Sequence, residues 1–266
     1  MIRVGAQGWN YDAWVGPFYP TGTRAVDYLG IYARAFDTVE VDSTFYGIPS
    51  AKTVRAWATR TPESFAFTLK LPQEITHERR LRDSGDVLVR FLEVARELGP
   101  KLGAILIQCA PSFGPAELPA LAAFLPLLPP DLHFAIEFRD RGWINEGVIA
   151  LLTEHRVALT LSDGRWIPRN TVMKLAEQPT SDIAYVRWMG PDQSIVDYSR
   201  LQVDRSAEIA RWSETLRQLQ QRVSTTFCFF NNHYAGHSPA SIRMLQEKLG
   251  QVPVDPAQLG DQLGLF

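Results

Sequence analysis

Apolar and polar residues alternate in eight short segments of the chain. In residues 134–139, Phe134 and Phe138 take even positions, whereas the charged Glu137 and Arg139 take odd positions. Successive side chains of a β-strand point to opposite faces, so each segment has one apolar face and one face with polar groups. We predict strands over Ile2–Ala6, Thr38–Val41, Phe65–Leu71, Gly103–Gln108, His133–Phe138, Val157–Leu161, Ile183–Trp188 and Thr226–Phe230.

Helical patterns separate these strands. They cover Ala25–Phe36, Ala51–Thr59, Gly85–Leu98, Ala116–Leu125, Asn145–His155, Ser206–Val223 and Pro239–Leu249. Only the connection between the sixth and seventh strands lacks a full helix, with a short one predicted at Thr171–Leu175. Strands that alternate with helices form parallel βαβ units. The chain of 266 residues is close to the ~250 typical of a (β/α)8 barrel.

We therefore predict an α/β protein, a single-domain TIM-type (β/α)8-like barrel over residues 1–266, with parallel strands and outer helices. The tail 251–266 is expected to pack on the barrel. A doubly wound open sheet is the alternative. It is less favoured because Gly5–Trp9 lacks the glycine spacing of a phosphate-binding loop. Polar positions on one face of nearly every strand also indicate a barrel interior rather than a sheet covered on both faces.

Charge and cysteine content limit the functional classes. A net charge of −2 provides no overall attraction to nucleic acid or anionic membranes. The two cysteines, Cys109 and Cys228, are not spaced like metal ligands and are expected to be buried. The chain enters its first strand at once, and no apolar run approaches the ~20 residues that span a bilayer. We expect a cytoplasmic protein with no membrane partner.

Acidic residues lie at predicted strand ends, where α/β barrels carry their active sites. Glu40 and Asp42 end the second strand, Glu137 ends the fifth, and Asp163 follows the sixth. Such carboxylates act as general acids and bases, as a glycosidase pair, or as ligands of hard metals. Alternatively, Glu40 and Glu137 pair with cations in a charge network, because buried charges need partners. Both readings remain open.

Three cations, Lys70, Arg139 and Arg187, share the inward phase of their strands. Guanidinium and ammonium groups aimed at one space favour an anionic ligand over a neutral sugar. His77, in the loop after the third strand, is a further candidate acid or base.

Aromatic and amide side chains are expected around the same mouth. Aromatic rings on loops stack on sugars or bases, or pack the loops onto the barrel. Amide side chains position ligands through hydrogen bonds. The candidates of these two kinds are Trp9, Tyr11, Phe45, Tyr46, Gln108, Asn231 and Asn232.

The chain resembles the YecE-like family, also called domain of unknown function 72. The matching motifs are Gly8-Trp-Asn-Tyr11, Glu40-Val-Asp-Ser-Thr-Phe-Tyr46, Lys70-Leu-Pro72 with Ile75-Thr-His77, Leu106-Ile-Gln108, Glu137-Phe-Arg139, Tyr185-Val-Arg187 and Asn231-Asn232 with Gly236. Two positions depart from the family pattern. Gln7 stands where a small hydroxyl residue is usual, and Met189 stands where histidine is usual. The resemblance implies a TIM-type barrel and no particular reaction.

These residues lead us to expect an enzyme of the hydrolase or isomerase type acting on a phosphorylated or other anionic ligand. Glu137, Glu40 and His77 are the candidate catalytic groups. A non-catalytic nucleic-acid-binding protein is the first alternative, and a glycoside hydrolase is the second. No cofactor is expected, and the histidines and carboxylates do not indicate a divalent metal site.

Overall fold

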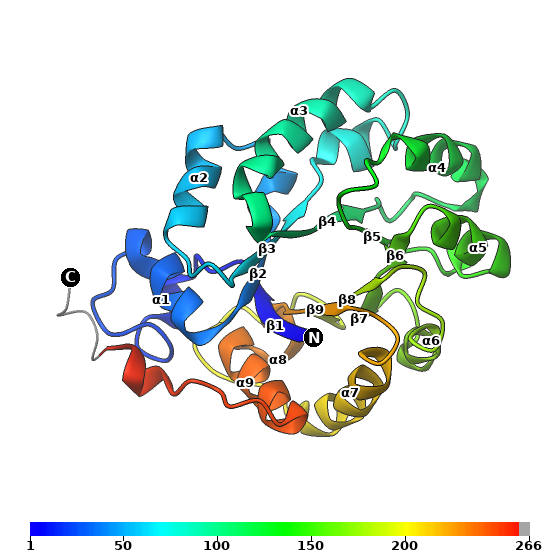
Figure 1. Ribbon diagram of the computed structural model, residues 1–266. Coiled ribbons are helices and arrows are strands. Elements are labelled where there is room, and N and C mark those ends of the chain that lie inside the picture. Colours follow the sequence, from blue (N-terminus) through cyan, green and yellow to red (C-terminus); the bar gives the residue numbers. More distant parts are fainter. Residues whose placement is uncertain (261–266) are drawn as a thin grey trace.

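Parallel strands surrounded by helices form a nearly closed barrel (Figure 1). The computed structural model describes residues 1–260. In chain order the strands are β1 (Ile2–Gln7), β2 (Thr38–Val41), β3 (Ala66–Lys70), β4 (Leu102–Gln108), β5 (Phe134–Glu137), β6 (Val157–Leu159), β7 (Leu161–Gly164), β8 (Ile183–Gly190) and β9 (Thr225–Phe230). Their order in the sheet is β6-β5-β4-β3-β2-β1-β9-β8-β7, which confirms the TIM-type barrel.

The sixth predicted strand is interrupted at Thr160, which explains why nine strands are found instead of eight. Before this residue β6 pairs with β5, and after it β7 pairs with β8. The backbone N–H of Thr160 still donates to the carbonyl of Ile136 at 2.8 Å. β6 and β7, the two ends of the strand order, are therefore consecutive in the chain. The chain changes its partner strand from β5 to β8 at Thr160.

Helices surround the strands on the outside of the barrel (Figure 1). They are α1 (Tyr28–Ala35), α2 (Ala51–Thr59), α3 (Gly85–Ala95), α4 (Leu118–Phe124), α5 (Glu146–Glu154), α6 (Arg169–Leu175), α7 (Ser206–Leu219), α8 (Asn232–Ala235) and α9 (Ser238–Leu249). Their ends follow capping chemistry. Ser50 accepts from the N–H of Thr53 at the start of α2, and α9 ends at Gly250 with a φ of 76°. The short helix α8 follows β9, the last strand.

Side-chain alternation in the strands divides the apolar residues into two clusters, as the sequence predicts. The larger cluster lies between strands and helices and includes Phe134, Ile136 and Phe138. The smaller cluster fills the barrel interior and consists of Ala66, Ala104, Leu106, Ala135, Ala158, Ile183, Tyr185, Phe227 and Phe229. Polar residues of the strand ends lie above this apolar interior, so it forms the floor of the barrel mouth.

The part of the tail that the structure describes contacts the barrel wall. Gln251 donates its side-chain amide to the carbonyl of Ile2 at 2.9 Å, and Leu259 is buried beside α1. The apolar residues Leu263, Leu265 and Phe266 of the same tail lie outside the described residues.

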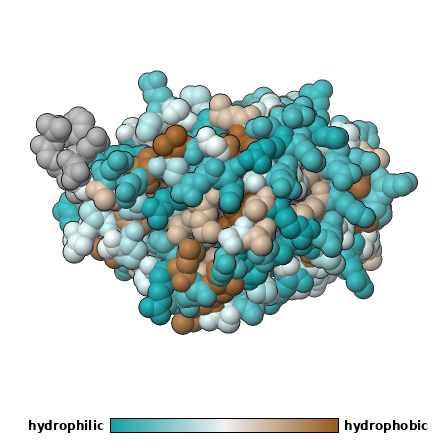
Figure 2. All heavy atoms as spheres, turned by 90° about the horizontal axis from the view of Figure 1, so that it is seen from below, coloured by the Kyte–Doolittle hydropathy of each residue, from teal (hydrophilic) through white to brown (hydrophobic). Residues whose placement is uncertain are grey.

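The surface seen in Figure 2 is mainly hydrophilic, with hydrophobic residues scattered over it. Within residues 1–260, no helix combines the length and the apolar character needed to cross a membrane. Cys109 and Cys228 are buried free thiols, as the sequence predicts.

Candidate active site at the barrel mouth

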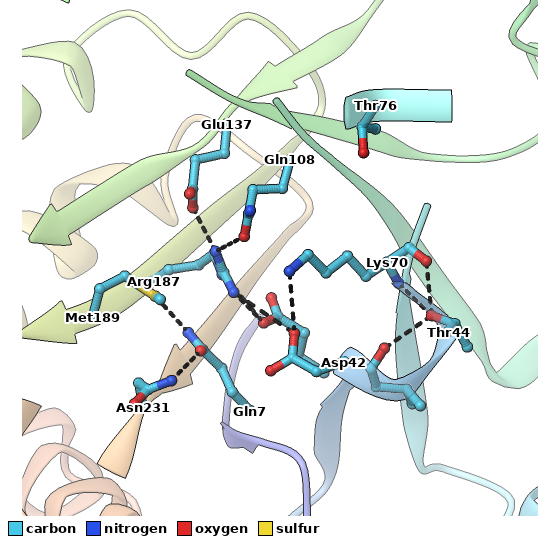
Figure 3. A network of polar contacts seen from close by, with 12 residues as sticks. Gln7, Asp42, Thr44, Lys70, Thr76, Gln108, Glu137, Arg187, Met189 and Asn231 are labelled. Atoms are coloured by element: carbon cyan, nitrogen blue, oxygen red, sulfur yellow. Dashed lines mark hydrogen bonds and ion pairs between the residues drawn. The ribbon is translucent and has the colours of Figure 1, made fainter. Parts of the chain in front are cut away.

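Arg187 is the centre of a buried charge network formed by four strands. Its guanidinium donates from Nη1 to Glu137 Oε2 at 2.6 Å and to Gln108 Oε1 at 3.2 Å, and from Nη2 to Glu40 Oε1 at 2.7 Å (Figure 3). Only 1% of the Arg187 side chain is exposed. The strand register explains the assembly, because Gln108 lies directly beside Glu137 on the neighbouring strand. Glu40 and Glu137 therefore belong to a charge network, as one interpretation of the sequence predicts. Because this network lies at the barrel mouth, the other interpretation, a functional site, is compatible with it.

Glu40 lies deepest in this network, on β2. Its Oε2 accepts a hydrogen bond from the hydroxyl of Tyr185 at 2.6 Å, and that hydroxyl also contacts Thr68 Oγ1 at 2.8 Å. The pKa of Glu40 is raised to about 7, because burial, with a smaller contribution from Asp42, outweighs the opposing effect of Arg187. Glu40 is therefore an acid that can hold a proton near neutral pH.

Glu137 behaves in the opposite way, although it is also buried. Burial raises the pKa of its carboxyl, but Arg187 and Arg139 outweigh burial, so the pKa lies below its ordinary value. Opposite shifts in two neighbouring carboxyls are typical of sites where one serves as an acid and the other as a base. Glu137 is the ionised member of this pair.

The raised pKa of Glu40 predicts a pH-dependent stability. The folded state holds the Glu40 proton up to about pH 7, whereas an unfolded glutamate releases it near ~4.3. The stabilising contribution of this proton is therefore complete below ~pH 4.3 and is lost as the pH rises to about 7. Relative to Glu40→Gln, the wild-type free energy of unfolding should fall by up to about 3 kcal/mol across this window.

Urea unfolding of both proteins between pH 4.5 and pH 8 measures this difference. The other groups that titrate in the window, such as His77, cancel in the comparison. A difference that stays flat or increases with pH would show that Arg187 keeps Glu40 ionised.

Lys70 ends β3 and lies at the side of the network nearest Asp42. Its Nζ lies 3.9 Å from Asp42 Oδ1 (Figure 3). The centre of the Phe45 ring is 4.1 Å from the same atom. Asp42 Oδ1 is also 3.9 Å from Arg187 Nη2, beyond hydrogen-bond distance. Within the described chain this oxygen is buried and has no hydrogen-bond partner. An unsatisfied carboxylate oxygen between two cations leaves a polar position for a ligand or a water molecule.

Arg139 extends from the end of β5 into a pocket on the mouth. Its only ion pair in the described structure is with Glu137, at 3.5 Å, and its buried Nε has no hydrogen-bond partner. The pocket is lined by Glu137, Arg139, Arg165, Trp166, Met189, Gly190, Asp192, Gln193, Asn231 and His233. Gly190 is required for this wall, because a Cβ there would lie 2.3 Å from the carbonyl oxygen of His233.

His77 lies in a π-helical turn, Glu74–Glu78, that follows β3. Its Nδ1 is 2.9 Å from the Thr76 hydroxyl, and its ring meets Phe45 edge-on at 4.9 Å. Burial lowers the pKa of His77 to about 4, with further contributions from Arg139, Lys70 and Arg80. The imidazole is therefore neutral at physiological pH, and its surroundings are electrically positive.

The two positions that depart from the family pattern contact each other. Gln7, on β1, donates its amide to the sulfur of Met189 at 3.0 Å and accepts from Asn231 at 2.8 Å (Figure 3). Asn231 also caps α8 through the N–H of His233. Gln7 thus links three strand ends on the pocket side of the mouth.

Some candidate residues lie outside this cluster. Asp163 points toward the outer helices, where it accepts from Trp212 Nε1 at 2.7 Å and from Arg169 Nε at 2.8 Å. Asn232 is buried and accepts from Trp14 Nε1 and the N–H of Ser238. Both residues are placed to join structural elements instead of contacting a ligand at the mouth.

The aromatic candidates have mixed positions. Trp9 meets Trp57 edge-on at 5.8 Å, and Tyr11 donates its hydroxyl to the carbonyl of Gln7 at 2.7 Å, so both pack the first loop onto the barrel. Phe45 lies inside the mouth beneath Lys70. Tyr46 next to it is 77% exposed.

The sequence reasoning did not select several residues of the mouth. Strand alternation could have identified Tyr185 and Gln7, because both occupy inward positions. Tyr185 is two residues from Arg187 on β8, and Gln7 is two residues from Gly5 on β1. Arg165, Asp192 and Gln193 lie in loops, where alternation gives no signal. Their contribution to the pocket follows only from the folded structure.

These features define the class of protein as a parallel α/β barrel with a buried, charge-balanced polar network at its mouth. The chain belongs to the family described as protein of unknown function DUF72, whose model matches residues 3–261. It is 27% identical to UPF0759 protein YecE of Escherichia coli strain K12, over 97% of this chain and 98% of that protein. Identity to UPF0759 protein YunF of Bacillus subtilis is also 27%, over 94% and 95% of the two chains.

A solved structure supports the same assignment. The crystal structure of a DUF72 family protein from Thermotoga maritima superposes with a TM-score of 0.77 and 25% identity, covering 94% of this chain and all of that one. The resemblance inferred from the sequence motifs is thereby confirmed. Family and fold are established together, and the reaction must be argued from the site.

Proposed function

We propose that this protein is an enzyme that binds a small anionic ligand, most simply a phosphorylated one, at the barrel mouth. The environment of the Arg139 side chain is the observation on which this proposal rests. Its guanidinium lies in the pocket beside Glu137, and its buried Nε, 3.5 Å from Glu137 Oε1, makes no hydrogen bond in the described chain. A buried guanidinium donor without an acceptor is costly, and an anion supplies the missing acceptors.

The electrostatics around Arg139 support an anion. Arg165 and His233 line the same pocket, and the neutral His77 lies in the positive field of Arg139 and Arg80. Glu137 and Asp192 are the acidic residues of the pocket lining. Glu137 is also bound to Arg187, which partly offsets its charge.

Acid–base chemistry is the function that the carboxylates support best. Glu137 lines the pocket as the ionised carboxylate, so it serves as the base that removes a proton from the ligand or from a water molecule. Glu40 does not line the pocket and acts by holding Arg187 and, through it, Glu137. Hydrolysis and isomerisation both use such a base.

Two other functions receive less support. A glycoside hydrolase needs open space between its two carboxylates for the scissile bond, and here the guanidinium of Arg187 bridges Glu40 and Glu137. A nucleic-acid-binding protein would need exposed rings for stacking. Of the four candidate rings, Tyr46 alone is largely exposed, and Trp14, Phe18 and Tyr19 of the first loop are almost entirely buried.

Arg139→Gln should weaken the binding of inorganic phosphate or a sugar phosphate by about 10–100-fold, the loss expected when a charge-assisted hydrogen bond is removed. The fold should remain intact, because Arg139 is at the edge of the network. Calorimetry and thermal shift with the purified protein measure the affinity. Arg141→Gln, two residues away on the exposed side of the same loop, is the matched control.

A second readout comes from His77. Bound phosphate offsets the surrounding cations, so the pKa of His77 should rise from about 4 when phosphate is added to the wild type. NMR of the histidine ring follows this change. Equal phosphate affinity in wild type and Arg139→Gln, with no change at His77, would contradict the proposal.

A further inference from the structure

Lys70 has an unusual environment for a lysine. The Thr44 hydroxyl fixes the backbone of Lys70 at the end of β3. The Lys70 N–H donates to Thr44 Oγ1 at 3.0 Å, and the Lys70 carbonyl accepts from the same hydroxyl at 2.7 Å. Only 10% of its side chain is exposed. The amine points toward Asp42 within the mouth (Figure 3) and lies over the Phe45 ring.

The Lys70 amine makes no hydrogen bond to any of residues 1–260, and its nearest carboxylate oxygen, Asp42 Oδ1, is 3.9 Å away. An ammonium group has three donors and is stable in a protein interior only when acceptors satisfy them. Lys101 illustrates the usual arrangement, with its Nζ donating to the carbonyls of Ala58 and Thr61. Among the described residues Lys70 therefore has fewer acceptors than Lys101, which shifts its balance toward the neutral amine with its free lone pair.

Electrostatics act in the same direction. Burial lowers the pKa of Lys70, Asp42 opposes this effect, and the neighbouring Arg187 lowers the pKa further. The Phe45 ring and the other two carboxylates stabilise the ammonium form, but the pKa still lies below its ordinary value. A buried lysine with a lowered pKa is the form in which this side chain acts as a nucleophile.

We propose that Lys70 is a nucleophilic amine that forms an imine with the carbonyl carbon of an anionic substrate. The inference rests on the proposed function for the anionic part of the ligand. Lys70 ends β3 and Arg139 follows β5, so both side chains lie at the same end of the barrel. A short keto acid or keto phosphate presents its anionic group to Arg139 and its carbonyl to Lys70.

The chemistry uses groups that are present at the mouth. The Nζ lone pair attacks the carbonyl carbon, the C=O π pair moves to oxygen, and a proton passes from nitrogen to that oxygen to give a carbinolamine. The Asp42 carboxylate then accepts the remaining N–H proton and passes it to the hydroxyl, which leaves as water while the nitrogen electron pair forms the C=N bond. The Asp42 oxygen nearest to Nζ has no other hydrogen-bond partner in the described chain, so it is available for this transfer.

Reductive trapping with formaldehyde tests the amine without knowledge of the substrate. The full-length protein is treated at pH 7 with limiting formaldehyde and cyanoborohydride, and peptide mass spectrometry locates the methylated lysines. Lys70 should react faster than Lys52, an exposed lysine on α2. The rate ratio should shrink toward pH 10, where an ordinary lysine also becomes neutral. An unmodified Lys70 at pH 7, or one whose pH dependence matches that of Lys52, would overturn the proposal.

Pyruvate and acetone then test the substrate class. Trapping with pyruvate should add the mass of the keto acid minus one oxygen atom at Lys70, and acetone should react less. Lys70→Met should abolish the adduct and Lys52→Met should retain it. Since Lys70→Met can also disturb the fold, the location of the adduct in the wild type decides the role of Lys70 independently.

The two proposals fail in different ways. If phosphate binding depends on Arg139 while Lys70 stays unreactive toward formaldehyde, the imine proposal falls and the anion site stands. If Lys70 reacts rapidly but Arg139→Gln does not reduce the pyruvate adduct, the amine stands and the role of Arg139 falls.

Discussion

Arg187→Met should lower the free energy of unfolding by about 3–5 kcal/mol, the cost of leaving buried charges without their partner. Glu40 and Glu137 are both almost fully buried, and each accepts a short hydrogen bond from this guanidinium. Methionine replaces the length of the side chain but none of its five donors. The effect should shrink at acidic pH, because protonation removes the uncompensated carboxylate charges.

Urea unfolding monitored by circular dichroism measures this loss. Arg96→Met is the matched control, because Arg96 pairs with Asp131 at the exposed surface, and its unfolding midpoint should remain close to that of the wild type. If Arg187→Met unfolds at the wild-type urea concentration, the network does not contribute to stability, and Arg187 is free to act as a ligand-binding residue.

Glu137→Gln should retain ligand binding but reduce turnover by about 10²–10⁴-fold, the usual contribution of a general acid or base. Glutamine can still accept a hydrogen bond from Arg187 and keeps the shape of the side chain. It cannot take up the proton. Turnover is measured on a sugar phosphate that calorimetry shows to bind the wild type, at fixed pH and with saturating ligand.

Glu146→Gln, at the exposed start of α5, is the control for a general effect of lost charge. Wild-type turnover in Glu137→Gln would remove Glu137 from the chemistry. Loss of the folded state in this variant would show that Glu137 serves mainly as a structural partner of Arg187.

The balance of charges at the mouth explains why these variants should differ. Three acidic side chains, Glu40, Asp42 and Glu137, accompany three basic side chains, Lys70, Arg139 and Arg187. Arg187 donates hydrogen bonds to Gln108, Glu137 and Glu40. Within the described residues, the side chains of Arg139 and Lys70 make no such hydrogen bonds. Arg187 therefore has a structural role, whereas Arg139 and Lys70 are available to a ligand.

Local alternation along the strands was enough to predict the barrel and the inward position of Glu40, Gln108, Glu137 and Arg187. The period of two residues is a property of the strand itself, so it can be read without knowing the fold. The same alternation, applied to Asp163, indicates an outward side chain and not the predicted position at the mouth. Its odd position matches that of the outward Val157 and Leu161, so extending the alternation by two residues would have directed it to the helices.

Only the tertiary structure decided which charges pair with one another. Strands separated by up to 147 residues in the sequence supply the partners of Arg187, and their spacing across the barrel cannot be derived from local periodicity. The same applies to the sixth strand, where Thr160 changes pairing because the barrel must close. The sequence by itself determined which side chains face the interior, because that property is local. The free donors of Arg139 and Lys70 arise from packing among strands, because hydrogen bonding depends on distances that only the closed barrel sets.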